Sequence, residues 1–273
     1  MATATMTETD KDTRTLVEYR KEGNIAVFLL TDPPANTYTH EMMRQLDECI
    51  LRARFDNDVQ CIVIRGAGEK FFSAGANIKM LNEADPVFKY YFCLHANETL
   101  SRLEQTPKLV IAAINGHCVG GGLEIAMAAD IRIARAEAGK IGLPEVNLGV
   151  LPGTGGTQRL ARIVGKAKAI ELMVTGRSFS FEEAQSMGLV TAVLPKDDWW
   201  DNVMLYAQQF TLPNKASMAV GHIKRSVVSG MEMSFESSLT LERELQNLLF
   251  KSQDAKEGIA AYVEKRQPVF KGK

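Results

Sequence analysis

The strongest constraint on the fold comes from three short apolar runs rich in valine and isoleucine. They span Ile25–Thr31, Val59–Arg65 and Leu109–Asn115, and turn-forming residues flank each of them. Apolar runs without alternation are typical of strands that are covered on both faces of a sheet. Between them, Glu41–Phe55 and Pro86–Gln105 have the residue pattern of helices. This succession of strands and helices predicts an α/β core.

From about residue 180 onward the sequence predicts helices alone. Ser180 and Glu183 have the spacing of a capping box before a short helix, and Asp254 and Glu257 have the same spacing before the last one. Amphipathic segments between them predict helices over residues 197–210, 215–229 and 235–250. We therefore expect a flexible tail over residues 1–15, a core over 16–200 and a helical region over 201–273. The apolar stripes of these helices fit packing on the core or on another subunit.

Composition and charge narrow the classes of function. Lys and Arg number 32 and Asp and Glu number 33, which argues against a protein that binds mainly by neutralising nucleic-acid phosphates. The 4 cysteines form no CxxC pair and the 4 histidines are scattered, so we expect free thiols in a reducing compartment and no metal site. The N-terminus lacks the apolar segment of a secretory signal, and glycines and polar residues interrupt the longest apolar stretch, Leu109–Ala129. These features predict a cytoplasmic protein without a membrane span.

Two glycine-rich segments follow the second and third predicted strands. Phe71–Ile78 contains Ala-Gly-Ala, and Asn115–Glu124 contains three successive glycines directly before helix-forming residues. The first amides of a helix have no internal partner and lie at the positive end of its dipole, so such a turn can stabilise a carbonyl oxygen that gains negative charge. The glycines would equally permit tight packing of strand against helix. The sequence contains neither of the two common glycine-rich nucleotide fingerprints.

Two glutamates stand beside these turns. Glu124 falls in the first turn of a predicted helix, and Glu145 follows Gly-Leu-Pro 21 residues later. Each alone fits a structural role, because acidic residues are favoured in first helical turns. Two carboxylates in one partly apolar pocket cannot both ionise easily, so one of them would hold a proton near neutrality. Such a pair could add water to a substrate or remove it.

The sequence resembles the enoyl-CoA hydratase/isomerase (crotonase) superfamily over residues 16–271. The resemblance runs over nearly the whole chain, and its matching segments follow one another in the family's order. They are residues 73–78 (SAGANI), 112–116 (AAING), 120–126 (GGGLEIA), 142–145 (GLPE), 148–160 (LGVLPGTGGTQRL), 175–176 (TG), 184–190 (AxxxGLV) and 263–266 (VEKR).

The resemblance implies a spiral of repeated ββα turns, with a helical C-terminal region used in trimer assembly and often a hexamer of two trimers. It implies an acyl-CoA substrate, with coenzyme A as part of that substrate and no separate cofactor, metal, nucleic-acid or membrane partner. Carried over by motif, the backbone amides of Ala74 and Gly121 form the oxyanion hole, and Glu124 and Glu145 are the two catalytic carboxylates. Residues carried over for substrate binding are Ala35, Ala76, Asn77, Ile78 and Gly120.

The joint presence of Glu124 and Glu145 favours an enoyl-CoA hydratase within this superfamily. Such an enzyme adds water syn across the double bond of a 2-enoyl-CoA to give a 3-hydroxyacyl-CoA, or catalyses the reverse dehydration in fatty-acid metabolism. A Δ3,Δ2-enoyl-CoA isomerase, which can work with the Glu145-type carboxylate alone, is the closest alternative. A non-catalytic acyl-CoA- or RNA-binding protein of the same fold is the alternative from a different class. We expect the acyl pocket to be lined from the region of Phe88, Tyr91 and Phe92.

Overall fold

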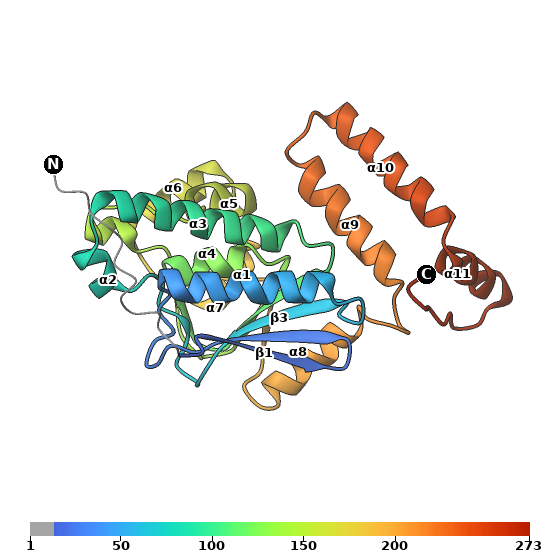
Figure 1. Ribbon diagram of the computed structural model, residues 1–273, viewed down its shortest axis with the longest axis horizontal. Coiled ribbons are helices and arrows are strands. Elements are labelled where there is room, and N and C mark those ends of the chain that lie inside the picture. The colour runs from blue at the N-terminus through green and yellow to red at the C-terminus, as the bar shows by residue number, and fades with distance from the viewer. Residues whose placement is uncertain (1–13) are drawn as a thin grey trace.

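Two sheets organise the computed structural model, which describes residues 14–273 (Figure 1). The larger sheet contains, in spatial order, β1 (Val17–Glu22), β2 (Ile25–Leu30), β3 (Cys61–Gly66), β5 (Leu109–Ile114), β7 (Ile131–Arg135) and β9 (Ala192–Leu194). The smaller sheet contains β4 (Phe71–Ser73), β6 (His117–Val119) and β8 (Ile141–Gly142). The β1–β2 pair is antiparallel and the other strand pairs are parallel.

Beyond its first hairpin, the chain repeats one path, from the larger sheet to the smaller sheet and then into a helix. After the β1–β2 hairpin comes α1 (His40–Phe55). Strands β3 and β4 then lead to α2 (Ile78–Glu83) and α3 (Pro86–Glu104), and β5 and β6 lead to α4 (Gly121–Met127). Strands β7 and β8 lead to the 3-10 turn η1 (Glu145–Leu148), α5 (Gly156–Val164) and α6 (Lys166–Thr175). This path confirms the predicted spiral of ββα turns.

The three predicted strands are β2, β3 and β5 at the centre of the larger sheet. Their alternate side chains enter two different apolar clusters, since Ile62 and Ile64 lie in one and Cys61 and Val63 in the other. Figure 1 shows α1 and α3 on one side of this sheet and α8 (Trp199–Gln208) on the other. Burial of both faces explains why these strands are apolar without alternation.

The prediction of helices alone beyond residue 180 is wrong at β9. This short strand extends the parallel ladder beside β7, so the core continues past α7 (Phe181–Ser186). Ser180 caps α7 as predicted by accepting the Glu183 amide at 3.1 Å, but the Glu183 carboxylate bonds Arg177 instead of completing a capping box. The expected boundary between residues 200 and 201 falls inside α8, where Trp199 and Val203 are buried against the sheet.

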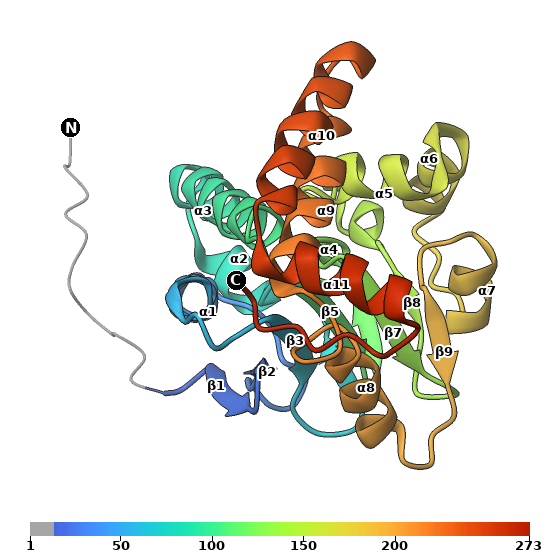
Figure 2. The ribbon, with the colours of Figure 1, turned by 90° about the vertical axis from the view of Figure 1, so that its right-hand side faces the viewer.

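The last three helices lie to one side of the rest of the chain (Figure 1). They are α9 (Ser217–Gly230), α10 (Phe235–Phe250) and α11 (Gln253–Glu264). The predicted capping box of Asp254 and Glu257 is wrong, because Ser252 caps α11. Asp254 instead accepts the amides of Lys271 and Gly272, each at 2.7 Å, as the C-terminal segment runs back beside α11 (Figure 2).

The apolar stripes of these helices remain largely uncovered in the single chain. The sequence pattern predicts one stripe of leucines along α10, of which Leu245 is buried, Leu248 is 49% exposed, and Leu241 and Leu249 are half-buried. On α9, Ile223 and Val227 are also exposed. The core therefore does not provide the surface on which these stripes pack.

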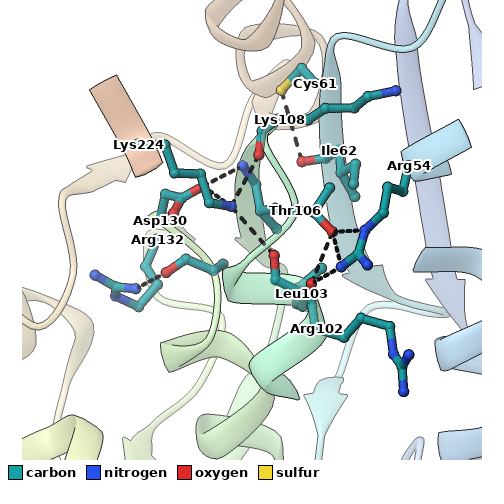
Figure 3. A network of polar contacts seen from close by, with 12 residues as sticks. Arg54, Cys61, Ile62, Arg102, Leu103, Thr106, Lys108, Asp130, Arg132 and Lys224 are labelled. Atoms are coloured by element: carbon teal, nitrogen blue, oxygen red, sulfur yellow. Dashed lines mark hydrogen bonds and ion pairs between the residues drawn. The ribbon is translucent and has the colours of Figure 1, made fainter. Parts of the chain in front are cut away.

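A buried ion pair attaches α9 to the core (Figure 3). The Lys224 ammonium lies 2.8 Å from the Asp130 carboxylate and donates to the Lys108 carbonyl at 3.0 Å. Asp130 also accepts the Val110 amide, at the start of β5, at 2.7 Å. Because a buried charge is costly unless it is paired and hydrogen-bonded, this network holds α9 in one position against β5.

We predict that Lys224→Met lowers the free energy of unfolding by about 3–5 kcal/mol, because it leaves Asp130 buried without its counter-charge. The double variant Lys224→Met/Asp130→Asn should recover much of that loss. Urea denaturation at a fixed protein concentration measures both effects, with the exposed Lys166→Met as the control variant. Wild-type stability of Lys224→Met would show that the ion pair does not hold the helix.

Candidate active site

Glu124 and Glu145 lie at one edge of the smaller sheet. Strands β6 and β8 are adjacent and parallel, with Val119 opposite Gly142, so their carboxyl ends meet at the same edge. Glu124 follows β6 in the first turn of α4, and Glu145 opens η1 shortly after β8. A methyl carbon placed on Gly120 would lie 3.0 Å from Glu145 Oε1, so this carboxylate reaches the turn that precedes α4.

The backbone that opens α5 holds the Glu124 carboxylate. Its Oε1 accepts the amides of Thr154 and Gly156, each at 2.7 Å, and the side chain is 2% exposed. Burial raises the pKa of Glu124 above its usual range, and the two amides oppose part of that shift. The two bonds fix one carboxylate oxygen in a single position, close to the positive end of a helix.

Glu145 has a different environment. Its Oε2 is buried and has no hydrogen-bond partner among the residues that the structure describes. Burial raises the pKa of Glu145 to about 7, and the nearby charge of Glu124 adds to this shift. A carboxyl group with this pKa can hold or release a proton near neutral pH.

The amide predicted for the first oxyanion position, that of Ala74, is already used within the fold. It donates to the Ala35 carbonyl at 2.9 Å, so this prediction is wrong. The Ala76 amide has no acceptor within residues 14–273. Tyr38 forms a parallel bridge with Ala76 in which its carbonyl accepts the Asn77 amide at 3.0 Å. In such a bridge the central residue directs its own amide away from the partner strand.

The Gly121 amide is also without an acceptor in the described chain, because Gly121 is the first residue of α4. A methyl carbon on Gly75 would lie 2.8 Å from the Gly121 nitrogen, so the backbone segments that carry the two free amides are in contact. Gly75 has φ +88°, a conformation that disfavours other residues. The glycines therefore both permit close packing and leave amides free.

The residues carried over for substrate binding lie around this edge. Asn77 caps α2 by accepting the Met80 amide at 3.0 Å, and Ile78 is 55% exposed beside it. Gly120 donates its amide to the Gly142 carbonyl at 2.9 Å. An open hollow of about 520 Å³ lies next to Asn77, which lines it together with Met80 and Phe88, among others.

The aromatic residues expected at the acyl pocket occupy different environments. Phe92 is buried and stacks on Tyr38, with ring centroids 5.5 Å apart. Phe88 stacks on Phe92 and lines the open hollow, whereas Tyr91 is 61% exposed. Of the three aromatic residues expected at the acyl pocket, Phe88 is therefore the one that lines the open hollow.

Sequence reasoning missed two residues of the site, Tyr38 and Thr154. The run Pro152–Gly156 before α5 could have indicated a helix start that binds an anionic side chain. No local signal indicated Tyr38, which reaches the site from the loop between β2 and α1.

Over residues 14–273 there is no group of three His, Cys, Asp or Glu side chains that could hold a metal ion. In the same part of the chain, no helix is long and apolar enough to cross a membrane.

Residues 20–273 match the family described as enoyl-CoA hydratase/isomerase. The chain belongs to this family. A probable enoyl-CoA hydratase of Bacillus subtilis is 41% identical over 253 residues, covering 91% of this chain and 95% of that protein. A short-chain-enoyl-CoA hydratase of Clostridium acetobutylicum is 37% identical, covering 90% of this chain and 94% of that protein.

Solved structures of the family share the fold. The crystal structure of an enoyl-CoA hydratase from Geobacillus kaustophilus superposes with a TM-score of 0.93 at 45% identity, covering 95% of this chain and 98% of that one. An enoyl-CoA hydratase from Bacillus anthracis gives a TM-score of 0.90 at 31% identity, covering 95% of this chain and 100% of that one. With relatives named enoyl-CoA hydratases at this identity and coverage, the chain is an enzyme of the family.

We predict that Glu145 titrates near pH 7 in the folded protein and that Glu124→Gln lowers its pKa. The neighbouring charge is removed in that variant, while the burial that causes most of the shift remains. NMR titration of isotopically labelled glutamate side chains measures both values. An unchanged pKa in Glu124→Gln would mean that the two carboxylates do not interact.

Proposed function

We propose that the chain is an enoyl-CoA hydratase. It adds water syn across the double bond of a 2-enoyl-CoA to give a 3-hydroxyacyl-CoA, or catalyses the reverse dehydration. The observation that supports this most is that two carboxylates with different environments lie at one edge of the sheet beside two free backbone amides. The names of the relatives agree with this activity.

In this proposal the thioester oxygen accepts hydrogen bonds from the amides of Ala76 and Gly121, which have no other acceptor in the described chain. Ala76 thus takes the role first expected for Ala74. The amides stabilise negative charge that develops on this oxygen as the enolate forms. Loss of one such donor typically costs about 10²–10³ in rate.

The two glutamates divide the proton transfers. Glu124, oriented by the Thr154 and Gly156 amides, takes a proton from a water molecule as the water oxygen bonds to the β-carbon. The electron pair of the double bond moves toward the thioester, which becomes an enolate. Glu145 then gives a proton to the α-carbon, which restores the thioester. A carboxyl group with a pKa of about 7 suits this donation near neutral pH.

Substrate binding and assembly belong to the same proposal. Coenzyme A is part of the substrate, and the segments around Ala35, Asn77, Ile78 and Gly120 contact it. The exposed apolar faces of α9 and α10 pack on neighbouring subunits of a homotrimer or of a hexamer built from two trimers. Exposed side chains such as Ile223, at 64%, fit a covered face of this kind.

We predict that the purified protein hydrates a short 2-enoyl-CoA, measured as loss of the conjugated thioester absorbance. Glu124→Gln and Glu145→Gln should each lower kcat about 10²–10⁴-fold, because each removes a positioned acid or base. Conversion of a 3-enoyl-CoA alone, with full activity in Glu124→Gln, would favour the isomerase. Salt-dependent RNA binding tighter than acyl-CoA binding would favour a binding protein.

A pair of glycine variants tests the position of Glu124. A methyl group on Gly156 would lie 2.9 Å from Glu124 Oε1 and 2.6 Å from Pro152 Cβ, whereas one on Gly153 meets nothing closer than Cys93 Sγ at 3.4 Å. We predict that Gly156→Ala lowers kcat about 100-fold by displacing the carboxylate, while Gly153→Ala stays close to wild type. Equal activities of the two folded variants would contradict the role of this loop.

A further inference from the structure

We infer that Tyr38 is a positioning residue of this site. Its hydroxyl fixes Glu124 through Thr154, while its backbone and ring fix the segments that carry the two free amides. The inference rests on the proposed hydratase activity and names a residue that contacts no reacting atom in that mechanism.

The hydroxyl of Tyr38 reaches across the site to the loop that holds Glu124. Tyr38 Oη and Thr154 Oγ1 are 2.9 Å apart, and both residues are 2% exposed. Thr154 donates its amide to Glu124 Oε1 at 2.7 Å. Tyr38, Thr154 and Glu124 therefore form one buried chain of hydrogen bonds, in which Thr154 uses its side chain toward Tyr38 and its backbone amide toward Glu124.

The remainder of Tyr38 contacts both segments that carry free amides. Its amide donates to the Gly75 carbonyl and its carbonyl accepts the Asn77 amide, each at 3.0 Å. A methyl carbon on Gly121 would lie 2.1 Å from Tyr38 Cε1, so the ring packs directly on the start of α4. The ring also stacks on Phe92. Tyr38 therefore connects the two backbone segments that carry free amides with the loop that holds the Glu124 carboxylate.

The charged and titratable groups around Glu124 determine the direction of a pH effect. Glu145 faces it from η1, Arg159 from α5, and Cys93 and Tyr38 lie nearby. Arg159 donates to the Thr154 carbonyl at 3.0 Å and so supports the same loop. The Thr154 amide favours the ionised form of Glu124, so loss of the Tyr38 hydroxyl, which holds the Thr154 loop in place, should raise the pKa of Glu124 further.

The experiment compares Tyr38→Phe with Tyr19→Phe. Tyr19 is the matched control because its buried hydroxyl has no partner among residues 14–273 and lies on β1, away from the site. We expect Tyr38→Phe to lower kcat roughly 2- to 10-fold, the effect of one hydrogen bond. Its KM should stay within about twofold of wild type, since the oxyanion segments keep their backbone bonds. The acidic limb of its kcat profile should move to higher pH, because the base must be ionised. Tyr19→Phe should match wild type.

Variants of Thr154 test the same chain of bonds independently of Tyr38. Thr154→Ser keeps the hydroxyl and should retain activity, whereas Thr154→Val should behave like Tyr38→Phe. The double variant Tyr38→Phe/Thr154→Val should lose no more than either single one, because both remove one shared interaction. If Tyr38→Phe does not fold, equal activity of the Val and Ser variants overturns the inference.

The outcomes separate this inference from the proposed function. An active wild type with unchanged kcat and pH profile in Tyr38→Phe overturns the inference and leaves the hydratase intact. An inactive wild type overturns the proposed function. In that case, NMR titration of Glu124 still decides the positioning role: a higher pKa in Tyr38→Phe supports it, and an unchanged pKa overturns it.

Discussion

Parallel pairing of the three short strands β4, β6 and β8 is the constraint on which the site depends. Each strand ends at the same edge of the smaller sheet, and each is followed by a segment that carries a free backbone amide or a glutamate of the candidate site. The segment with the free Ala76 amide follows β4, Gly121 and Glu124 follow β6, and Glu145 follows β8. The larger sheet sets this arrangement. Its strands β3, β5 and β7 lie in this order, and the strands that follow them in the chain, β4, β6 and β8, lie in the same order in the smaller sheet.

The two carboxylates gain different properties from their surroundings. Both are removed from water, which favours the protonated form of each. Glu124 accepts two backbone amides, whereas Glu145 Oε2 has no partner in the described chain. One carboxyl group is thus fixed by the fold, and the other is left to exchange a proton. This difference suits a reaction that needs both a base and an acid.

The C-terminal helices differ from the core in how their apolar side chains are buried. The core buries strands on both faces, whereas the Lys224–Asp130 pair helps to attach α9 to it. Several apolar side chains of α9 and α10, among them Ile223 and Leu248, remain exposed in one chain. Such faces are stable in water when other subunits cover them, which is why assembly belongs to the proposed function.

The sequence by itself determined the central strands, because their apolar pattern is local, while the spiral order and the pairing of the two glutamates came from the resemblance of its motifs to the family. Only the tertiary structure decided which amide is free. Ala74 and Ala76 look equivalent in sequence, but Ala35 accepts the first amide and the bridge to Tyr38 turns the second one outward. Likewise, the C-terminal segment that runs back beside α11 donates two backbone amides to Asp254, a residue that the sequence pattern predicts to be part of a helix cap. Hydrogen bonds between residues distant in the chain depend on how whole segments pack, and no local pattern encodes them.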